Sequence, residues 1–213
     1  MPELVFDCVG AEPARFAAVP SMTLKLRITE TSGERVEAIA LRCQVRIEPH
    51  RRRYSATEAE ALHDLFGDTD RWSETVKPIQ FTTLSTMVPG FTGATIHELP
   101  MPFSYDLEIA ATKFFSALED GVIPLLLLYS GTVFGMREGR LSVAQVPWSK
   151  ESSYPLPVPV WRETMDLHFP DSAWFRVRLD TLASLRRYKS RNALPTWDAT
   201  LEELLAGVEE RRS

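Results

Sequence analysis

Glu60 and His63 form an E-x-x-H pair in a stretch with helical periodicity. Two residues three apart on a helix lie on one face, and carboxylate-bridged di-metal sites use this arrangement. Such sites also require a second E-x-x-H pair and two further carboxylates from neighbouring helices, and the sequence has no second pair. We therefore expect a solvated helix face here and no metal site.

The other histidines and the two cysteines do not form a ligand pattern. His50, His97 and His168 are scattered, and the chain has no His-x-His or Cys-x-x-Cys spacing of the kind that zinc sites use. Cys8 and Cys43 both fall in apolar strand patterns, which favours two reduced core thiols over a redox pair or a shared metal site. We expect no cofactor.

Ser130 lies in the stretch YSGT, which lacks the Gly-x-Ser-x-Gly elbow of a hydrolase nucleophile. The pair Ser130 and Gly131 instead indicates a bulge or a close approach of two backbones. A nucleophile, base and acid that are distant in the sequence stay an open alternative. No phosphate-binding glycine loop of the Walker or dinucleotide type is present.

Two basic clusters stand out in a chain of net charge −5. If both lie on the same side of the fold, they form a positive surface for an acidic partner; the plainer interpretation is a solvated face paired with nearby Asp and Glu. The acidic balance, without stacking aromatics beside the charge, argues against nucleic acid. The second cluster begins with Arg176 and Arg178, and the candidate partner-binding residues are Arg42, Arg46, Arg51, Arg52, Arg53, Arg186, Arg187, Lys189 and Arg191.

Five tryptophans lie mostly outside the alternating segments. Residues of this type clamp helices onto a sheet or form a recognition surface, and we favour the clamp. They are Trp72, Trp148, Trp161, Trp174 and Trp197.

The element expected to organise these residues is the stretch 121–135, GVIPLLLLYSGTVFG. Its run from Val122 to Tyr129 carries no charge and is too short to span a bilayer. Its β-branched residues, Pro124 and flanking glycines favour a strand over a helix. The stretch is therefore predicted to be a central strand that is buried on both faces.

Alternating apolar residues predict further strands, among them 22–28 and 39–47, which we expect to pair as a hairpin through the turn at Gly33. Ser55 and Glu58 fit a capping box that begins a helix over 56–66. Residues 112–118 fit either a strand or a helix. About eight strands joined by turns predict an α+β fold, a mainly antiparallel, immunoglobulin-like β-sandwich with one inserted helix and a C-terminal helical segment packed on it.

The domain plan follows from composition. Residues 1–147 are expected to form the sandwich, the Pro- and Ser-rich stretch 148–159 an extended connector, and residues 160–213 the helical segment that packs on the sandwich. We see no secretory signal and no run long enough for a membrane helix, so we expect a cytoplasmic protein with no membrane partner.

Four phrases carry a resemblance that covers nearly the whole chain: FAAVPSMTLKLRI, the stretch from RRRYS to LFG, EDGVIPLLLLYSGTVF, and LRRYKSRNALPTW. Together they resemble an uncharacterised bacterial family, a domain of unknown function often encoded beside the genes of uptake NiFe hydrogenases. The resemblance implies an accessory role in assembling or stabilising a metalloenzyme, and it implies no catalytic or ligand residues.

Two hypotheses follow. The first is a non-enzymatic protein-binding accessory or scaffold whose partner is a hydrogenase subunit or maturation factor. The second is a small-molecule or lipid-binding module, or an unrecognised hydrolase, with a pocket between the sandwich and the helices. A filled interior favours the first, and a deep apolar cavity with convergent polar groups favours the second.

Overall fold

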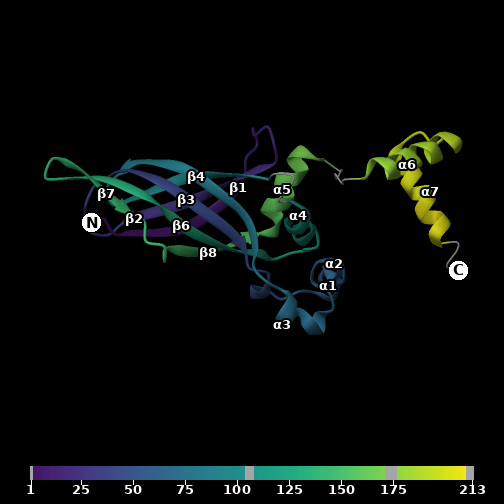
Figure 1. Ribbon diagram of the computed structural model, residues 1–213, viewed down its shortest axis with the longest axis horizontal. Helices are drawn as coiled ribbons and strands as arrows, with labels where there is room; N and C mark the ends of the chain where they lie inside the picture. The colour runs from purple at the N-terminus through teal and green to yellow at the C-terminus, as the bar shows by residue number, and fades with distance from the viewer. Residues whose placement is uncertain (1, 104–107, 171–176, 210–213) are drawn as a thin grey trace. The chain divides into compact units, whose positions relative to one another are not determined.

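The structure is a computed structural model that describes residues 2–103, 108–170 and 177–209, with the backbone alone at positions 108, 109 and 209. The chain forms two compact units, Met1–Asp171 and Ser172–Ser213. The first unit holds both sheets and most of the helices. Figure 1 shows its strands crossing as two layers, with the helices gathered at one end of the sandwich.

The described residues contain eight strands in two antiparallel sheets, so the expected α+β sandwich is confirmed. The first sheet has three strands in the order β1-β2-β5. The second has five, in the order β4-β3-β6-β7, with β8 also paired to β6. The strands are β1 (Leu4–Pro13), β2 (Ser21–Glu30), β3 (Val36–Ile47), β4 (Ile79–Phe91), β5 (Ala94–Pro102), β6 (Val122–Arg137), β7 (Arg140–Gln145) and β8 (Glu151–Pro157).

The predicted hairpin between residues 22–28 and 39–47 is wrong. β2 pairs with β1 and β5, whereas β3 pairs with β4 and β6, so the turn at Gly33 carries the chain from one sheet to the other. At this crossing the buried Glu30 carboxylate accepts hydrogen bonds from the backbone N–H groups of Glu3 and Ser32. Period-two alternation shows that each strand has one buried face, but it does not show which strand lies beside it.

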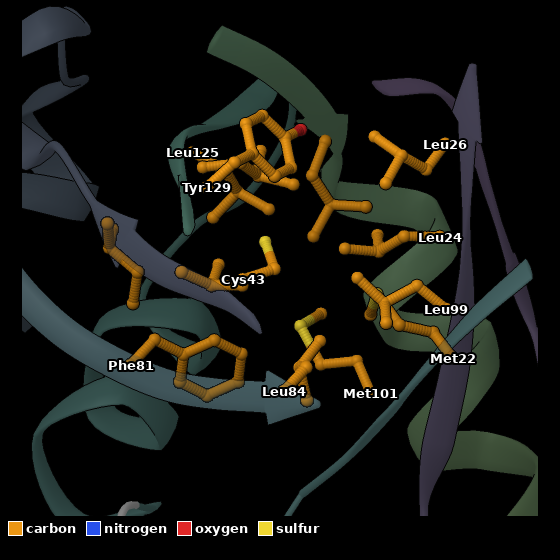
Figure 2. Close-up of a cluster of buried hydrophobic side chains, with 14 of the residues drawn as sticks. Met22, Leu24, Leu26, Cys43, Phe81, Leu84, Leu99, Met101, Leu125 and Tyr129 are labelled. Atoms are coloured by element: carbon orange, nitrogen blue, oxygen red, sulfur yellow. The ribbon is translucent and has the colours of Figure 1, made fainter. Parts of the chain in front are cut away.

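The core lies between the two sheets. Figure 2 shows Leu24, Leu26 and Leu99 of the three-stranded sheet facing side chains of the other sheet, among them Cys43, Leu125 and Tyr129. The Tyr129 ring stacks on Phe6 with a centroid distance of 4.5 Å, and its hydroxyl shares a hydrogen bond of 2.7 Å with Ser152. Interdigitation of this kind fills the interior of a sandwich.

β6 is the central strand that the sequence predicts, since it has β3 on one side and β7 and β8 on the other. The prediction that both of its faces are buried is wrong. Ile123, Leu125 and Leu127 are buried, while Leu126 and Leu128 on the opposite face are partly exposed. The uncharged composition of this run therefore reflects one core face and one apolar face that is partly open to solvent.

The segment between β3 and β4 forms several short helices, whereas the sequence predicts a single helix over 56–66. The capping box at Ser55 and Glu58 is confirmed, and Gly67 with a φ of 73° ends the second α-helix. The helices are η1 (Pro49–Arg51), α1 (Ala56–Ala61), α2 (His63–Phe66), η2 (Thr69–Arg71) and α3 (Trp72–Thr75).

Helix α4 (Glu108–Ser116) decides between the alternatives for 112–118 in favour of helix. It packs with α5 (Val158–His168) against the end of the sandwich through aromatic rings. Phe115 lies 5.5 Å from Phe81 of β4 and 5.6 Å from Trp161 of α5, measured between ring centroids.

Within the stretch 148–159, expected as an extended connector, Glu151–Pro157 forms strand β8 and pairs with β6, while Val158 and Pro159 begin α5. This pairing is possible because β8 lies at the border of the sheet, where Pro155 and Pro157 are tolerated. The C-terminal segment is divided: α5 belongs to the first unit, while α6 (Leu179–Arg191) and α7 (Trp197–Glu209) form the second. The Thr196 hydroxyl accepts a hydrogen bond of 3.0 Å from the Ala199 N–H and so caps α7.

Candidate protein-binding face

The outer face of the five-stranded sheet is formed by the residues that alternate with the core. Directly opposite residues in an antiparallel pair point to the same side. Ala40 of β3 lies opposite Met87 of β4 and Thr132 of β6, and two residues along the sheet Ala38 lies opposite Phe134. These cross-strand rows place residues from distant parts of the sequence on one surface.

This face carries exposed apolar side chains on β4, β6 and β7. Phe134 lies opposite Val143 and Met136 opposite Leu141 in the β6–β7 hairpin, which reaches past the neighbouring strands at the left of Figure 1, while Met87 lies on β4 at the other border of the sheet. Exposed apolar side chains gathered on one face mark interaction surfaces. We call this set the apolar cluster: Met87 (58% exposed), Phe134, Met136 (53%), Leu141 (66%) and Val143 (57%).

Beside the apolar cluster the outer face has a hollow of about 390 Å³. Its floor includes Leu128, and its lining includes Arg42, Ser130 and Trp148, whose indole side is 91% exposed. Gln44 donates a hydrogen bond of 2.6 Å to Gln80 on the same lining. Within the described part of the chain, the Arg42 side chain has no hydrogen bond and no ion pair, so its guanidinium is free to bind an anion.

The five arginines of the first cluster have three different environments. Arg42 and Arg46 lie on the outer face of β3, and Arg53 is exposed in the following loop. Arg51 lies 3.3 Å from the Glu48 carboxylate and donates to the Ser153 hydroxyl of β8 at 3.2 Å. The Arg52 side chain is only 9% exposed and does not belong to the surface that the sequence predicts.

Arg52 is the centre of a structural network. Its guanidinium donates at 2.6 Å to the Glu58 carboxylate and at 3.0 Å to the Val122 carbonyl, and the two charged side chains are 9% and 4% exposed. Burial by itself raises the pKa of the Glu58 carboxyl, but hydrogen bonds from the Glu119 and Ser55 N–H groups, together with Arg52, bring it below its ordinary value. The pair ties the helical insert to the start of β6.

The first basic cluster lies in the first unit and the second basic cluster in the second unit. Arg186, Arg187 and Arg191 are exposed on α6. The Lys189 ammonium donates to the carbonyls of Leu194 and Pro195, at 2.5 Å and 2.9 Å, and lies 6.0 Å from the Trp197 ring centre. Lys189 therefore holds the loop between α6 and α7. Arg176 falls outside the described residues.

The His63 side chain and the two thiols, which could in principle do chemistry, are not arranged as a reactive site among the described residues. His63 of the E-x-x-H pair lies 3.1 Å from the Asp68 carboxylate at the surface. Burial raises the pKa of the Cys8 thiol to about 11 and that of Cys43 to about 12, so both are protonated and poorly nucleophilic at neutral pH. Among the described residues, no group of three or more His, Cys, Asp or Glu side chains is placed to hold a metal ion.

Gly131 makes the close backbone approach that the sequence predicts. A Cβ at this position would lie 2.1 Å from the Ala40 carbonyl oxygen, and its φ is 147°. Trp161 acts as a clamp, since it packs on Phe115, which contacts Phe81 of β4. The Trp72 indole N–H instead donates to the Gly67 carbonyl within the helical insert. Trp148 does not act as a clamp, and Trp174 lies outside the described residues.

Sequence reasoning missed the apolar cluster, and it favoured a clamp for Trp148, which is 91% exposed. Leu141 and Val143 alternate with Ser142 and Ala144, and it is the small residues that face inward. A period of two identifies the residues that share a face but does not identify the inner face. Leu141 and Val143 mislead about which face of β7 is buried, because large apolar residues are the ones expected in a core.

The fold is an antiparallel α+β sandwich. The outer face of its five-stranded sheet carries exposed apolar side chains and the side chains of Arg42 and Arg46, which have no ion pair within the described chain. The model of a family of unknown function, DUF6084, matches residues 1–213, and the chain therefore belongs to that family. The comparison with curated proteins finds no match. No helix among the described residues is long and apolar enough to cross a membrane.

Proposed function

We propose that this chain is a non-enzymatic accessory protein that binds another protein through its apolar cluster. The observation that supports this proposal is the exposure of Met87, Met136, Leu141 and Val143 on three strands of one sheet face, each more than half open to solvent. Patches of this kind cost free energy in water unless a partner covers them. Methionine adapts to varied surfaces and is enriched at interfaces.

The interior of the first unit supports this function over the second hypothesis. A pocket between sandwich and helices needs space where α4 and α5 meet the strands, and there the Phe115 ring contacts both the Phe81 ring and the Trp161 ring. Phe115 is 1% exposed and Trp161 is 8% exposed.

The first partners to test are the subunits and maturation factors of a NiFe hydrogenase, which the sequence resemblance suggests. Deleting the gene in a host that carries such a hydrogenase is expected to lower hydrogenase activity or the metal content of the large subunit. Unchanged activity and metal content would remove this partner and leave the protein-binding role to be tested directly.

The direct test is affinity capture with the full chain under reducing conditions. The double variant Leu141→Asp/Val143→Asp places two charges in the apolar cluster and is expected to lose the proteins that the wild-type chain captures. Ile96→Asp is the matched control, because Ile96 is 58% exposed on the other sheet. Both variants should keep their stability within about 0.5 kcal/mol, as is usual for surface substitutions. Equal capture by all three chains, or capture by none, contradicts the proposal.

A further inference from the structure

We infer that the partner segment combines apolar side chains with a carboxylate, and that this carboxylate binds Arg42 in the hollow beside Trp148. The inference rests on the proposed function and specifies the chemistry of the partner. It depends on the position of the hollow, on its donor groups and on the exposure of its tryptophan.

The hollow and the apolar cluster form one continuous surface. Arg42 follows Ala40 by two residues on β3, which is about 7 Å along a strand, and Ala40 lies opposite Met87 of the cluster. On the neighbouring strand, Ser130 of the hollow lies opposite Arg42, and Thr132 lies opposite Ala40. A segment that covers the apolar cluster therefore reaches Arg42 within two or three extended residues.

The chemistry of the hollow suits a carboxylate. Arg42 is the charged group of its lining, and no described residue satisfies its N–H groups. A guanidinium offers two parallel N–H donors that match the two oxygens of a carboxylate. The Ser130 hydroxyl and the Gln80 amide, on the same lining, can donate to the same group.

The surrounding charge favours a single carboxylate over a phosphate group. Arg46 lies two residues beyond Gln44 on the same face and is also unpaired within the described chain, which extends the positive surface. Arg51 is balanced by Glu48, and Glu151 of β8 lies opposite Leu128, at the border of the hollow. A dianion would meet one free guanidinium in the hollow and the Glu151 carboxylate nearby, whereas a monoanion is matched by Arg42 alone.

Trp148 supplies the apolar wall of the same site. Tryptophan is largely buried in most folds, and a 91% exposed indole beside an unpaired arginine has the composition of an interface centre. A partner side chain that binds Arg42 would cover the indole and exclude water from the ion pair.

The test is a selection of peptides from a phage-displayed random dodecapeptide library on immobilised full-length chain. On the wild-type chain the recovered peptides should be enriched in apolar residues together with Asp or Glu. On Arg42→Gln the Asp and Glu enrichment should disappear while the apolar enrichment stays. Arg53→Gln is the matched control, since Arg53 is exposed and lies outside the hollow, and it should recover the same peptides as the wild type.

The strongest recovered peptide is then synthesised with its carboxylate and with the corresponding amide. The carboxylate form should change Trp148 fluorescence and should bind at least tenfold more tightly than the amide form to the wild-type chain, with no such preference for Arg42→Gln. The result that overturns the inference is an Asp and Glu enrichment independent of Arg42, recovered peptides without acidic residues, or no enrichment. Capture of a partner that Leu141→Asp/Val143→Asp abolishes and Arg42→Gln leaves unchanged would preserve the proposed function and reject this partner chemistry.

Discussion

Arg52 and Arg53 are neighbours in the sequence, yet one is buried in an ion pair and the other is exposed. The difference comes from Glu58 and from the carbonyls of Asp120 and Val122, all of which accept from Arg52. The Arg52 guanidinium also lies 5.0 Å from the centre of the Tyr54 ring. At the scale of single residues, the contacts made by a side chain decide whether a positive charge is a binding group or a structural one.

Replacing Arg52 by Leu is expected to reduce the free energy of unfolding by about 3–5 kcal/mol, because it leaves the buried Glu58 carboxylate without its cation. Arg53→Leu is the matched control and should change stability by no more than about 0.5 kcal/mol. Urea unfolding followed by circular dichroism measures both. Equal stability of the two variants would show that Arg52 is not a structural residue.

The Glu30 carboxyl, where the chain passes from one sheet to the other, makes the stability of the fold depend on pH in the acid range. Hydrogen bonds from the Ser32 side chain and from backbone N–H groups lower its pKa from 4.5 to about 2. Because the folded pKa is below the unfolded value, the stabilising effect is complete above about pH 4.5 and is lost as the pH falls towards 2.

Glu30→Gln should therefore be less stable than the wild-type chain at pH 7, and the difference should shrink as the pH falls from 4.5 towards 2. Unfolding by urea at pH 7, 4 and 3 measures this. A difference that stays constant over this range would mean that the Glu30 charge does not contribute to stability.

Two glycines of strand β6 differ in how much room the surrounding backbone leaves for a side chain. At Gly131 it approaches the backbone of β3 so closely that no side chain fits, and the positive φ is unfavourable for other residues. Gly135 of the same strand is different, because a Cβ there would lie at an ordinary distance of 3.7 Å from the nearest atom, the Arg35 carbonyl oxygen.

Gly131→Ala is expected to reduce the free energy of unfolding by roughly 2–3 kcal/mol, or to prevent folding, since it combines backbone strain with a clash. Gly135→Ala should be nearly neutral, within about 0.5 kcal/mol. Thermal unfolding of the two variants beside the wild-type chain provides the comparison. A stable Gly131→Ala variant would contradict the close approach of β6 and β3.

At the scale of the whole molecule, the two units differ in how they are stabilised. Among the described residues, the buried hydrophobic core runs from Leu4 to Trp161 and lies within the first unit. The second unit holds α6 and α7, whose described contacts include the Tyr188 hydroxyl on Glu203 at 3.0 Å. Several of its apolar side chains are exposed, among them Leu179 at 83% and Leu205 at 65%.

A fragment of residues 1–171 is therefore expected to fold alone and to unfold cooperatively, with a Tm close to that of the full chain. A fragment of residues 172–213 should show little helix, since two short helices make a marginal core. Circular dichroism of both fragments tests this. A molten or aggregated 1–171 fragment would show that the first unit depends on the second.

The sequence by itself determined the features that depend on near neighbours. The alternation of β3 and the capping box at Ser55 and Glu58 both involve residues within a few positions of one another. The antiparallel sandwich also follows, since one-sided strands joined by turns have few other ways to bury their apolar faces.

Only the tertiary structure decided which strands are neighbours, which arginine is buried and which apolar residues face outward. Met87 and Val143 share a surface, and Arg52 reaches carbonyls near position 120, although these residues are far apart in the sequence. Such contacts depend on strand order and register. The alternation of a strand predicts neither, because the strand has two faces and only packing against a second sheet decides which one is buried.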